Sequence, residues 1–395
     1  MSAPAFCTIL ARNYLPKALA LAESLQRHGS TEPLTVFLTD AGPETELPEH
    51  AGVRYLYPAL LDLAPRTVLD LAMSYDLVEF ATAVKPLVLG QLLDEHEQVF
   101  YLDPDTFVTS PLAELAPALT ASASGILLTP HYLSPVPAGA QFTEGHLLAV
   151  GVYNLGFCGV DRRAREFLRW WWSHLSSECL HDAVAGLFVD QKWVDVGAVL
   201  FDAAALKHAG YNVSVANLHE RPIGCDDSGY VIGSTGEPLR LFHFHAFDTS
   251  RPDELSTRLN ESTASIRSDN VALDDLCREY AAVLIEKEKL AGPPPAYRFA
   301  ADSRGRRITR RMRHAYRVAV QSGASVPSPF VAAEADAWTA WRRRSAPLVG
   351  RLMLSDLAKG VRCALPEEYD NLKHRLPGLA ARFRSRVVED SGMWR

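Results

Sequence analysis

Short apolar runs alternate with amphipathic stretches over the first 260 residues. The run AFCTIL (5–10) and the run LTVFLTD (34–40) are typical of buried strands, and apolar residues recur between them at helical spacing until Gly29. The same alternation continues with strand candidates at 99–103, 125–130 and 150–160 and with helix candidates at 85–94 and 162–175. Strands that alternate with helices predict an α/β fold, in which helices cover both faces of a mainly parallel sheet.

The pattern changes beyond residue 248. Residues 271–290 form the clearest helical stretch, the GPPP segment (292–295) interrupts it, and the remaining chain is Arg-rich and mostly helical in pattern. We therefore predict two domains: an α/β domain over residues 1–260 and a mostly helical, Arg-rich region over residues 261–395.

Composition and cysteine usage limit the cellular setting. The 395 residues are 48% hydrophobic and 22% charged, which is ordinary for a soluble globular enzyme. The sequence has no apolar run of membrane-spanning length, and no basic segment precedes the first apolar stretch as in a signal peptide. The six cysteines are scattered without a CxxC pair, which favours reduced thiols in a cytoplasmic protein.

Charge is distributed unevenly along the chain. Residues 1–290 hold 20 Lys and Arg against 38 Asp and Glu, whereas residues 291–395 hold 20 against 9. Three interpretations of the basic tail stay open: a peripheral contact with an anionic membrane, pairing with the acidic front region within the chain or in a homodimer, and a solvated face. Nucleic acid fits poorly, since no binding motif accompanies the patch and the pI is near 6.0.

The segment VFYLDPDTFV (99–108) carries two acidic residues, Asp103 and Asp105, directly after an apolar strand. On an extended backbone, residues two apart point to the same side, so both carboxylates can face one hard cation at the carboxyl edge of the sheet. The alternative is a helix N-cap followed by a proline turn.

Two further segments place polar groups after apolar runs. In LRLFHFHAFD (239–248), His243 and His245 alternate with aromatic residues as in a strand, which suits either a metal site tolerant of Mn²⁺ or a pair of core histidines. In GLFVDQKWVD (186–195), Asp190 and Gln191 could meet a substrate, and their spacing equally fits a helix N-cap.

Taken together, these segments resemble a known family. The motifs ILARNYLPKALALAESL, FATAVKP, YLDPDTFV, YNLGF, FVDQKW, YNVSVANLHER and HFHAFD occur in that order over residues 5–260. They look like the retaining glycosyltransferases of the GT-A fold, the group that includes glycogenin, the lipopolysaccharide galactosyltransferases and their bacterial relatives. The resemblance implies a Rossmann-like domain that binds a sugar nucleotide.

The resemblance also implies roles for individual residues. The family's acidic pair and C-terminal histidine hold Mn²⁺ or Mg²⁺, which here gives Asp103, Asp105 and His243. Ala246 stands where the family has glycine, and His245 stands where a small or hydroxyl residue is common, so His245 is either a donor to phosphate or the ligand itself. The remaining implied residues are Lys85 near the donor diphosphate; Thr8, Arg12, Asn13 and Tyr14 around the nucleoside; Asn154 and Gly156 at the donor sugar; Asp190 and Gln191 as catalytic residues; His131 on the acceptor side; and Asn212, Asn217 and Arg221 in fixing a loop.

The function that follows is transfer of a hexose from a nucleotide sugar, most simply a UDP-hexose, to an acceptor hydroxyl. The acceptor stays open between glycan, lipid, protein and secondary metabolite. Two other interpretations are a nucleotidyltransferase on a similar sheet, although ARNYLPKA (11–18) lacks a Gly-rich phosphate loop, and a non-catalytic protein that binds sugar nucleotides.

Overall fold

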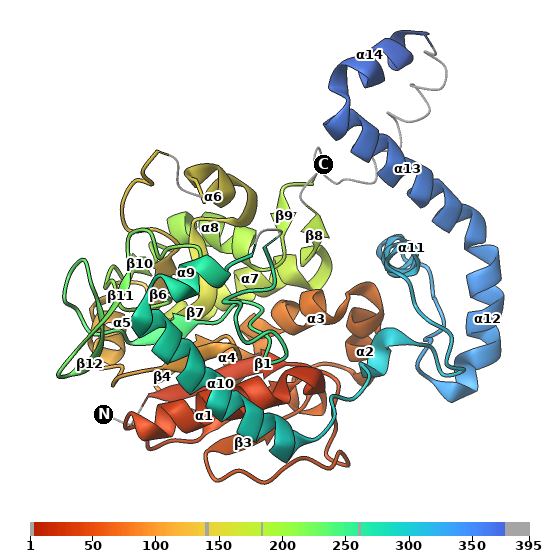
Figure 1. Cartoon of the computed structure of the whole chain (residues 1–395). Helices are drawn as coiled ribbons and strands as arrows, with labels where there is room; N and C mark the ends of the chain where they lie inside the picture. Colours follow the sequence, from red (N-terminus) through yellow and green to blue (C-terminus); the bar gives the residue numbers. More distant parts are fainter. Residues whose placement is uncertain (1–3, 139–141, 183–184, 260–261, 376–395) are drawn as a thin grey trace. The chain divides into compact units, whose positions relative to one another are not determined.

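A seven-stranded sheet forms the centre of the α/β part of the chain. The computed structural model describes residues 4–138, 142–182, 185–259 and 262–375 (Figure 1). The strands, in order across the sheet, are β10 (Ala204–Ala205), β6 (Ile126–Pro130), β7 (Tyr153–Asp161), β4 (Gln98–Leu102), β1 (Ala5–Leu10), β2 (Leu34–Leu38) and β3 (Val53–Leu56). β7 runs antiparallel to β4 and β6, and the other pairs are parallel. The predicted mainly parallel sheet is therefore confirmed.

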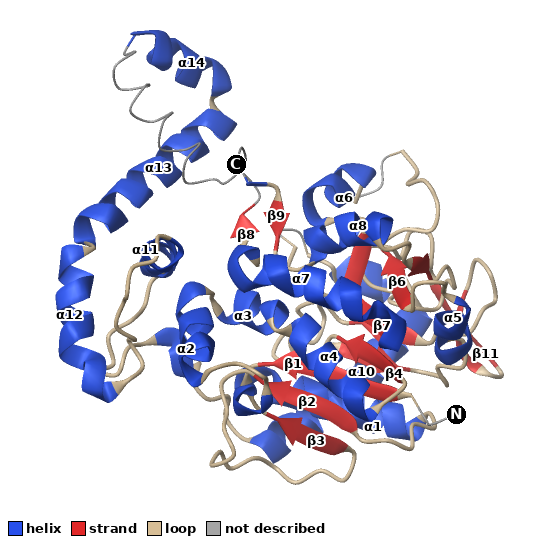
Figure 2. Cartoon of the chain, turned by 180° about the vertical axis from the view of Figure 1, so that it is seen from behind, coloured by secondary structure: helices blue, strands red, loops and turns tan. Residues whose placement is uncertain are grey.

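Helices lie on both sides of this sheet (Figure 2). The helices of the α/β part of the chain are α1 (Leu15–Arg27), α3 (Leu77–Ala83), α4 (Lys85–Glu95), α5 (Leu115–Ala121), α6 (Glu144–Val150), α7 (Arg165–Glu178), α8 (Gln191–Leu200), α9 (Ala264–Ser268) and α10 (Val271–Ala291), with short 3₁₀ turns at Arg12–Tyr14, Pro58–Leu60 and Arg162–Ala164. α1 packs against α10, and α4 packs against α7 and β4. The strand expected over 150–160 begins only at Tyr153, because the residues before it close helix α6.

Three two-stranded ribbons complete the strands of the described chain. They pair β5 (Thr106–Val108) with β13 (Leu241–His243), β11 (Ile223–Asp226) with β12 (Gly229–Ile232), and β8 (His181–Asp182) with β9 (Leu187–Phe188). The β5–β13 ribbon matters most for the site, because it brings a late segment of the chain beside the end of β4.

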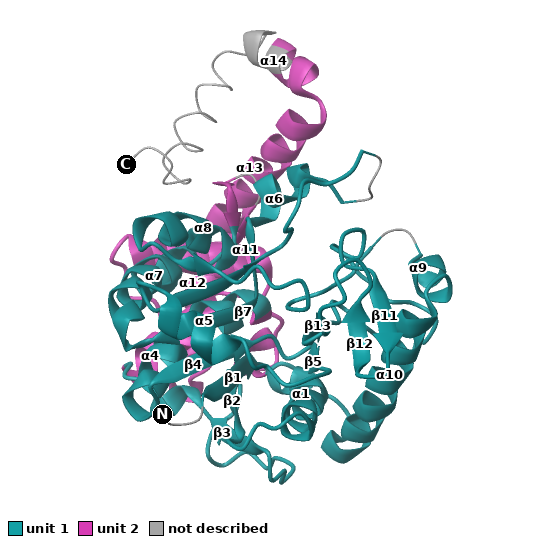
Figure 3. Ribbon diagram, turned by 90° about the vertical axis from the view of Figure 1, so that its left-hand side faces the viewer, with its two compact units in different colours: residues 1–63, 78–180, 188–297 teal, residues 64–77, 181–187, 298–395 magenta. Residues whose placement is uncertain are grey.

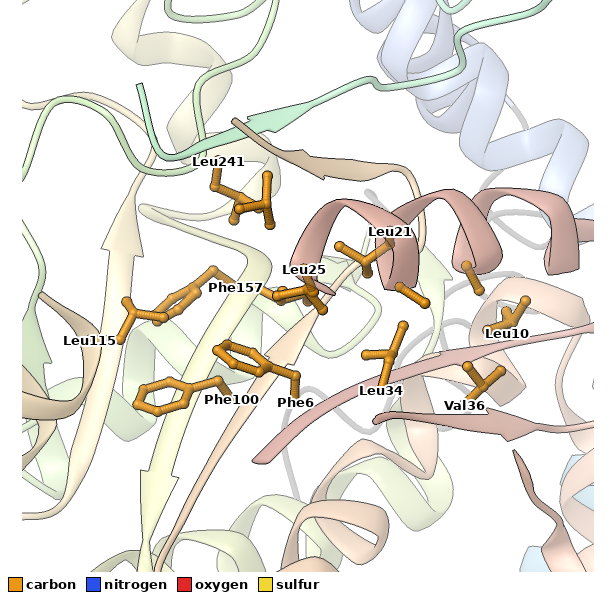
Figure 4. Packing of buried hydrophobic residues seen from close by; sticks show 14 of the residues in the cluster. Phe6, Leu10, Leu21, Leu25, Leu34, Val36, Phe100, Leu115, Phe157 and Leu241 are labelled. Atoms are coloured by element: carbon orange, nitrogen blue, oxygen red, sulfur yellow. The ribbon is translucent and has the colours of Figure 1, made fainter. Parts of the chain in front are cut away.

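The core beneath α1 is built from alternate residues of neighbouring strands (Figure 4). Phe6, Phe100 and Phe157 come from β1, β4 and β7, and the centroids of successive rings lie 5.8 and 6.1 Å apart. Leu21 and Leu25 of α1 cover them. Because side chains alternate along a strand, the neighbouring residues, such as Cys7 and Tyr101, face the opposite side of the sheet.

The chain divides into two compact units, and the second is mostly helical (Figure 3). Unit 1 comprises residues 1–63, 78–180 and 188–297, and unit 2 comprises residues 64–77, 181–187 and 298–395. The main elements of unit 2 are α2 (Pro65–Ser74), α11 (Arg310–Gln321), α12 (Ala335–Arg344), α13 (Ala346–Ala364) and α14 (Pro366–Arg375), with 3₁₀ turns at Arg298–Ala300 and Ala332–Glu334. The predicted domain boundary at residue 260 stays a prediction, since compactness does not measure independent folding.

Several arginines of unit 2 have structural partners. Buried Asp302 accepts hydrogen bonds from Arg306 and from the indole of Trp338, and Arg342 lies 3.7 Å from the same carboxylate. The Arg313 guanidinium is buried and donates to the backbone oxygens of Ala72 and Tyr75. Part of the basic charge therefore stabilises unit 2 itself, and the membrane and homodimer contacts stay predictions. None of the helices in the described ranges has the length and apolar character needed to span a bilayer.

Candidate functional site

The predicted site residues gather at one edge of the sheet. This edge carries the carboxyl ends of β1 and β4 and, because β7 is antiparallel, the amino end of β7. The strand order reverses between β1 and β4, since the chain builds outward to β3 on one side and returns to β4 on the other. Ligands bind at such a switch point in open α/β sheets.

Asp103 and Asp105 lie in a tight turn, not on an extended strand as expected. The turn spans Asp103 to Thr106, whose N–H and hydroxyl both donate to the Asp103 carbonyl oxygen, at 3.1 and 2.7 Å. Pro104 occupies the second position of the turn, where its fixed φ is favoured. The turn, and not the alternation of a strand, therefore brings the two carboxylates to one side.

His243 completes a three-residue cluster with these carboxylates. Strand β13 pairs with β5 so that His243 lies opposite Thr106, and the imidazole Nε2 is 3.0 Å from Asp105 Oδ1 and 3.5 Å from Asp103 Oδ2. One ligand atom from each of the three residues lies within 4.8 Å of the other two. Two carboxylates and an imidazole nitrogen held this closely favour a positive charge among them, which a divalent cation or a protonated imidazole would supply.

The electrostatics of Asp105 agree with this arrangement. Burial of the Asp105 carboxylate raises its pKa, but the adjacent His243 and Lys17 lower it more, so the pKa lies below its ordinary value. Asp105 is therefore ionised at neutral pH and can serve as a ligand.

His245 lies beyond the end of β13, which corrects the expectation that both histidines alternate along one strand. Its ring stacks on the ring of His243, with centroids 3.6 Å apart and an interplanar angle of 22°. Burial lowers the pKa of His245 well below its ordinary value, and His243 adds to this shift. His245 is therefore a neutral imidazole beside the cluster, and its predicted role stays a prediction.

Lys85 and Asp190 form a buried ion pair next to the cluster. The Nζ–Oδ2 distance is 2.6 Å, and the side chains are only 2% and 3% exposed. The Lys85 ammonium also lies 4.0 Å from the centroid of the Tyr101 ring. Burial lowers the pKa of Lys85, but Asp190 and Asp103 outweigh this effect and raise it, so the lysine is charged. Asp190 does occupy the N-cap position of α8, yet its side chain makes no capping hydrogen bond and is directed to Lys85 instead.

The backbone beside Asp190 is strained. Val189 has φ = +42°, a conformation that is unfavourable for a β-branched residue. Strain of this kind persists only where the surrounding structure enforces it, and it is concentrated at functional sites.

The side chain of Gln191 contacts three other segments of the chain. Its Oε1 accepts from the Leu155 N–H at 3.1 Å, and its Nε2 donates to the Val150 carbonyl at 2.9 Å. The same Nε2 lies 3.3 Å from Nε2 of His131. This contact requires His131 to be neutral, because only an unprotonated ring nitrogen can accept from an amide.

We expect His131 to make the protein sensitive to acid. Burial, together with His146, lowers the pKa of His131 to about 3. In the unfolded chain His131 takes up a proton near pH 6.5, whereas in the folded chain it does so only near pH 3. The contribution of neutral His131 to the free energy of unfolding is therefore complete above pH 6.5 and is lost progressively as the pH falls toward 3. The free energy of unfolding should decrease by about 1.4 kcal/mol per pH unit through this group alone. Urea unfolding of the wild type and His131→Gln between pH 7 and pH 4 checks this, and equal slopes for the two proteins would contradict it.

Asn154 and Gly156 lie at the start of β7, against the cluster. Asn154 Oδ1 accepts from the Gly156 N–H at 3.0 Å, and the Gly156 carbonyl accepts from the Asp103 N–H at 2.9 Å. The buried Nδ2 of Asn154 has no acceptor within the described part of the chain. It is thus a donor that a bound molecule could satisfy.

The four residues predicted around a nucleoside occupy different settings. Thr8 lies inside β1 and is fully buried, not in a loop, whereas Arg12, Asn13 and Tyr14 form the 3₁₀ turn after β1. The Arg12 N–H donates to Asp40 at 2.9 Å. Among the described residues, Thr8 Oγ1 and Asn13 Oδ1 are buried without a hydrogen-bond partner. The structure brings these residues to the same sheet edge as the cluster, and their role toward a nucleoside stays a prediction.

Sequence reasoning missed Tyr101 and Lys17. The Tyr101 hydroxyl donates to Asp103 Oδ1 at 2.5 Å, and Lys17 Nζ lies 4.7 Å from the centroid of the Tyr14 ring. Tyr101 could have been found, because it precedes Asp103 by two positions. Lys17 could have been found from its place one helical turn after Tyr14.

The backbone conformation at Ala246 bears on the position where the family pattern has glycine. Its φ is +51°, in the left-handed region that favours glycine, so the chain keeps the turn despite the substitution.

We expect Ala246→Gly to raise the free energy of unfolding by about 1 kcal/mol, since the left-handed penalty of a side chain exceeds the entropy cost of glycine. Urea denaturation measures this difference. Ala324→Gly, at an exposed position outside the left-handed region, serves as the control and should be neutral or destabilising. A loss of stability in Ala246→Gly would contradict the expectation.

Comparison with known proteins gives a distant sequence relative. No known family model matches the sequence. The chain is 26% identical over 304 residues to the uncharacterized protein YfnF of Bacillus subtilis (strain 168), a match that covers 73% of this chain and 95% of YfnF.

Solved structures that resemble the chain carry the names of glycosyltransferases, the class that the sequence motifs resemble. One is a glycosyltransferase involved in glycosylation of the major capsid of PBCV-1, at 12% identity and TM-score 0.35, covering 61% of this chain and 93% of that one. Another is the galactosyltransferase LgtC in complex with donor and acceptor sugar analogs, at 15% identity and TM-score 0.41, covering 71% and 95%. A third is GlyE of Streptococcus pneumoniae TIGR4, at 14% identity and TM-score 0.40, covering 75% and 66%. These similarities are low, so a function for this chain has to rest on its own site.

Proposed function

We propose that this protein is a metal-dependent glycosyltransferase that transfers a hexose from a UDP-hexose to an acceptor hydroxyl with retention of the anomeric configuration. The observation that carries the proposal is the Asp103–Asp105–His243 cluster at the switch point of the sheet. A cluster of this kind suits a cation that binds the diphosphate of a nucleotide sugar.

Asp103, Asp105 and His243 would hold the cation, and their chemistry favours Mn²⁺ over Mg²⁺ because one ligand is an imidazole. When bound, the ion supplies positive charge that stabilises the negative charge developing on the departing nucleoside diphosphate. The chain adds its own positive charge with Lys85, and the imidazole of His245, stacked on that of His243, would donate to phosphate.

The donor would be held along the same sheet edge. Thr8 and Asn13 each contribute a buried polar atom to a nucleoside, and the ring of Tyr14 is partly exposed and can stack on a flat base. The free Nδ2 of Asn154 donates to a hydroxyl of the sugar.

The chemical step exchanges one bond at the anomeric carbon. The bond to the diphosphate oxygen breaks and its electron pair stays on that oxygen, while the acceptor oxygen bonds to the same face of the carbon and its proton passes to the released phosphate. Asp190 stabilises the positive charge on the sugar. An Asp190 carboxylate already paired with Lys85 at 2.6 Å is a weak nucleophile, which supports same-face attack over a double displacement.

A nucleotide panel tests this proposal. Thermal unfolding is measured with UDP, GDP and dTDP, each with and without Mn²⁺, and UDP release from UDP-glucose and UDP-galactose is followed without added acceptor. We expect stabilisation by UDP that depends on Mn²⁺, with slow UDP release from one of the sugars. Binding of UDP without any release would favour a non-catalytic binding protein, and no stabilisation by any of the three nucleotides would overturn the proposal.

A further inference from the structure

Asn212 contacts the imidazole of His243 on the side away from the carboxylates. Its Oδ1 lies 3.0 Å from His243 Nδ1. The orientation of the amide is set by its other end, where Nδ2 donates to the Asn154 carbonyl at 2.9 Å and to Thr129 Oγ1 at 2.8 Å. A backbone carbonyl can only accept, so the nitrogen of the amide must face Asn154 and the oxygen must face His243.

This orientation decides which nitrogen of His243 carries the proton. Oδ1 of an amide only accepts, so Nδ1 of His243 must be the donor. In the neutral ring, Nε2 is then unprotonated, and its lone pair faces Asp103 and Asp105. Without an acceptor at Nδ1, the proton would instead move to Nε2 and hydrogen-bond to Asp105 at 3.0 Å, where it would compete with a cation.

The backbone around Asn212 is held independently of the imidazole. Asn212 has φ = +54°, which asparagine tolerates better than most residues, and it is 1% exposed. Asn217 Nδ2 donates to the Asn212 carbonyl at 3.2 Å, and Arg221 donates to the Tyr211 carbonyl at 3.0 Å. Asn217 and Arg221 were expected to fix a loop, and the hydrogen bonds that they donate hold the backbone that positions Asn212.

Gly156 provides the space for this arrangement. A Cβ at residue 156 would lie 2.3 Å from His243 Nδ1, closer than atoms can approach, and at a tight 3.0 Å from Asn212 Oδ1. A side chain there would displace the ring of His243 and break its contact with Asn212.

We propose that Asn212 is a positioning residue that keeps His243 in the Nδ1–H tautomer and so presents Nε2 to a cation, and that Gly156 is glycine because the imidazole occupies the place of its side chain. The proposal rests on the proposed function, since it concerns the same metal site. Partners of this kind, bonded to the outer nitrogen of a ligand histidine, typically affect metal affinity 10- to 100-fold.

Three variants separate positioning from folding. Asn212→Gly removes the acceptor without strain at φ = +54°, Asn212→Asp keeps an acceptor there, and Asn217→Ala disturbs the loop without contacting the imidazole. Mn²⁺ affinity is measured by electron paramagnetic resonance of the free ion. The tautomer of His243 is read from the ¹⁵N shifts of the metal-free protein at a pH where the ring is neutral.

We expect the Mn²⁺ Kd to rise about 10- to 100-fold in Asn212→Gly and to return to within a fewfold of wild type in Asn212→Asp. In Asn217→Ala the Kd should rise less than in Asn212→Gly, because the Asn212 backbone loses one hydrogen bond but its side-chain oxygen is retained. The ring should be protonated at Nδ1 in wild type and at Nε2 in Asn212→Gly. An unchanged Kd and tautomer in Asn212→Gly would overturn the inference. If wild type binds Mn²⁺ with Nε2 protonated in the free protein, the inference fails while the proposed function stands; if wild type shows the Nδ1–H tautomer but binds no Mn²⁺, the metal part of the proposed function fails instead.

Should Asn212→Gly not fold, the comparison of Asn212→Asp with wild type still decides. An aspartate that keeps the Nδ1–H tautomer supports the inference, and one that leaves Nε2 protonated contradicts it.

Discussion

Asp105→Asn is expected to lower the rate of UDP release about 1,000-fold and to abolish the Mn²⁺-dependent rise in Tm. The Asp105 carboxylate lies 3.0 Å from His243 Nε2 and is largely buried. Loss of one anionic ligand weakens binding of the proposed cation. The stabilisation that the cation gives to the charge on the leaving group, worth several kcal/mol, is then lost as well. Steady-state kinetics and thermal unfolding with and without Mn²⁺ measure both effects.

The matched control is Asp94→Asn. Asp94 is 67% exposed and pairs with Arg165 on the surface, so its loss should leave both measurements unchanged. A variant Asp105→Asn that kept full turnover and the full Mn²⁺ response would show that the acidic pair does not bind the cation.

Asp190→Ala should lower the free energy of unfolding by about 3–5 kcal/mol, because it leaves the ammonium of Lys85 buried without its partner. The ion pair is nearly inaccessible to solvent, so the unpaired charge cannot be screened. Urea unfolding measures the loss. UDP release should fall as well, because the proposed function assigns this carboxylate to stabilising the charge on the sugar.

A surface ion pair with the same N–O distance as the buried pair serves as the comparison. Arg165 and Asp94 also lie 2.6 Å apart, but both side chains are exposed, so breaking that pair should cost at most about 1 kcal/mol. The double variant Lys85→Met/Asp190→Leu removes both buried charges and should recover most of the stability without recovering activity. A cost for Asp190→Ala as small as that of Asp94→Asn would refute the buried-pair interpretation.

The strands and helices of unit 1 were largely predictable, because hydrophobic alternation reports local structure. The helix expected over 85–94 is α4, and the strand expected over 125–130 is β6. The antiparallel direction of β7 was not predictable, since a strand buried on both faces has the same pattern in either direction. The assignment of residues 64–77 to unit 2 was equally hidden, because it depends on packing with residues that follow some 230 positions later in the chain.

The identity of the candidate site residues was predictable from the sequence, whereas the hydrogen bonds and contacts between them were less so. Asp103 and Asp105 stand out by their position after a strand, but the turn that joins them depends on hydrogen bonds that the spacing does not reveal. Asn212 gave no signal of its contact with His243, since 31 residues separate them and only the fold brings them together. Contacts of this kind depend on tertiary structure, so they cannot be predicted from a single sequence.

The β5–β13 ribbon has a consequence for biosynthesis. All seven strands of the main sheet are complete by Ala205, whereas His243 arrives with β13. A nascent or truncated chain that stops before this residue contains the sequence of every strand of the main sheet and both acidic residues, but it lacks the third proposed ligand. Under the proposed function, such products would lack part of the cation site, so competence to bind the cation would mark a chain that has been synthesised past His243.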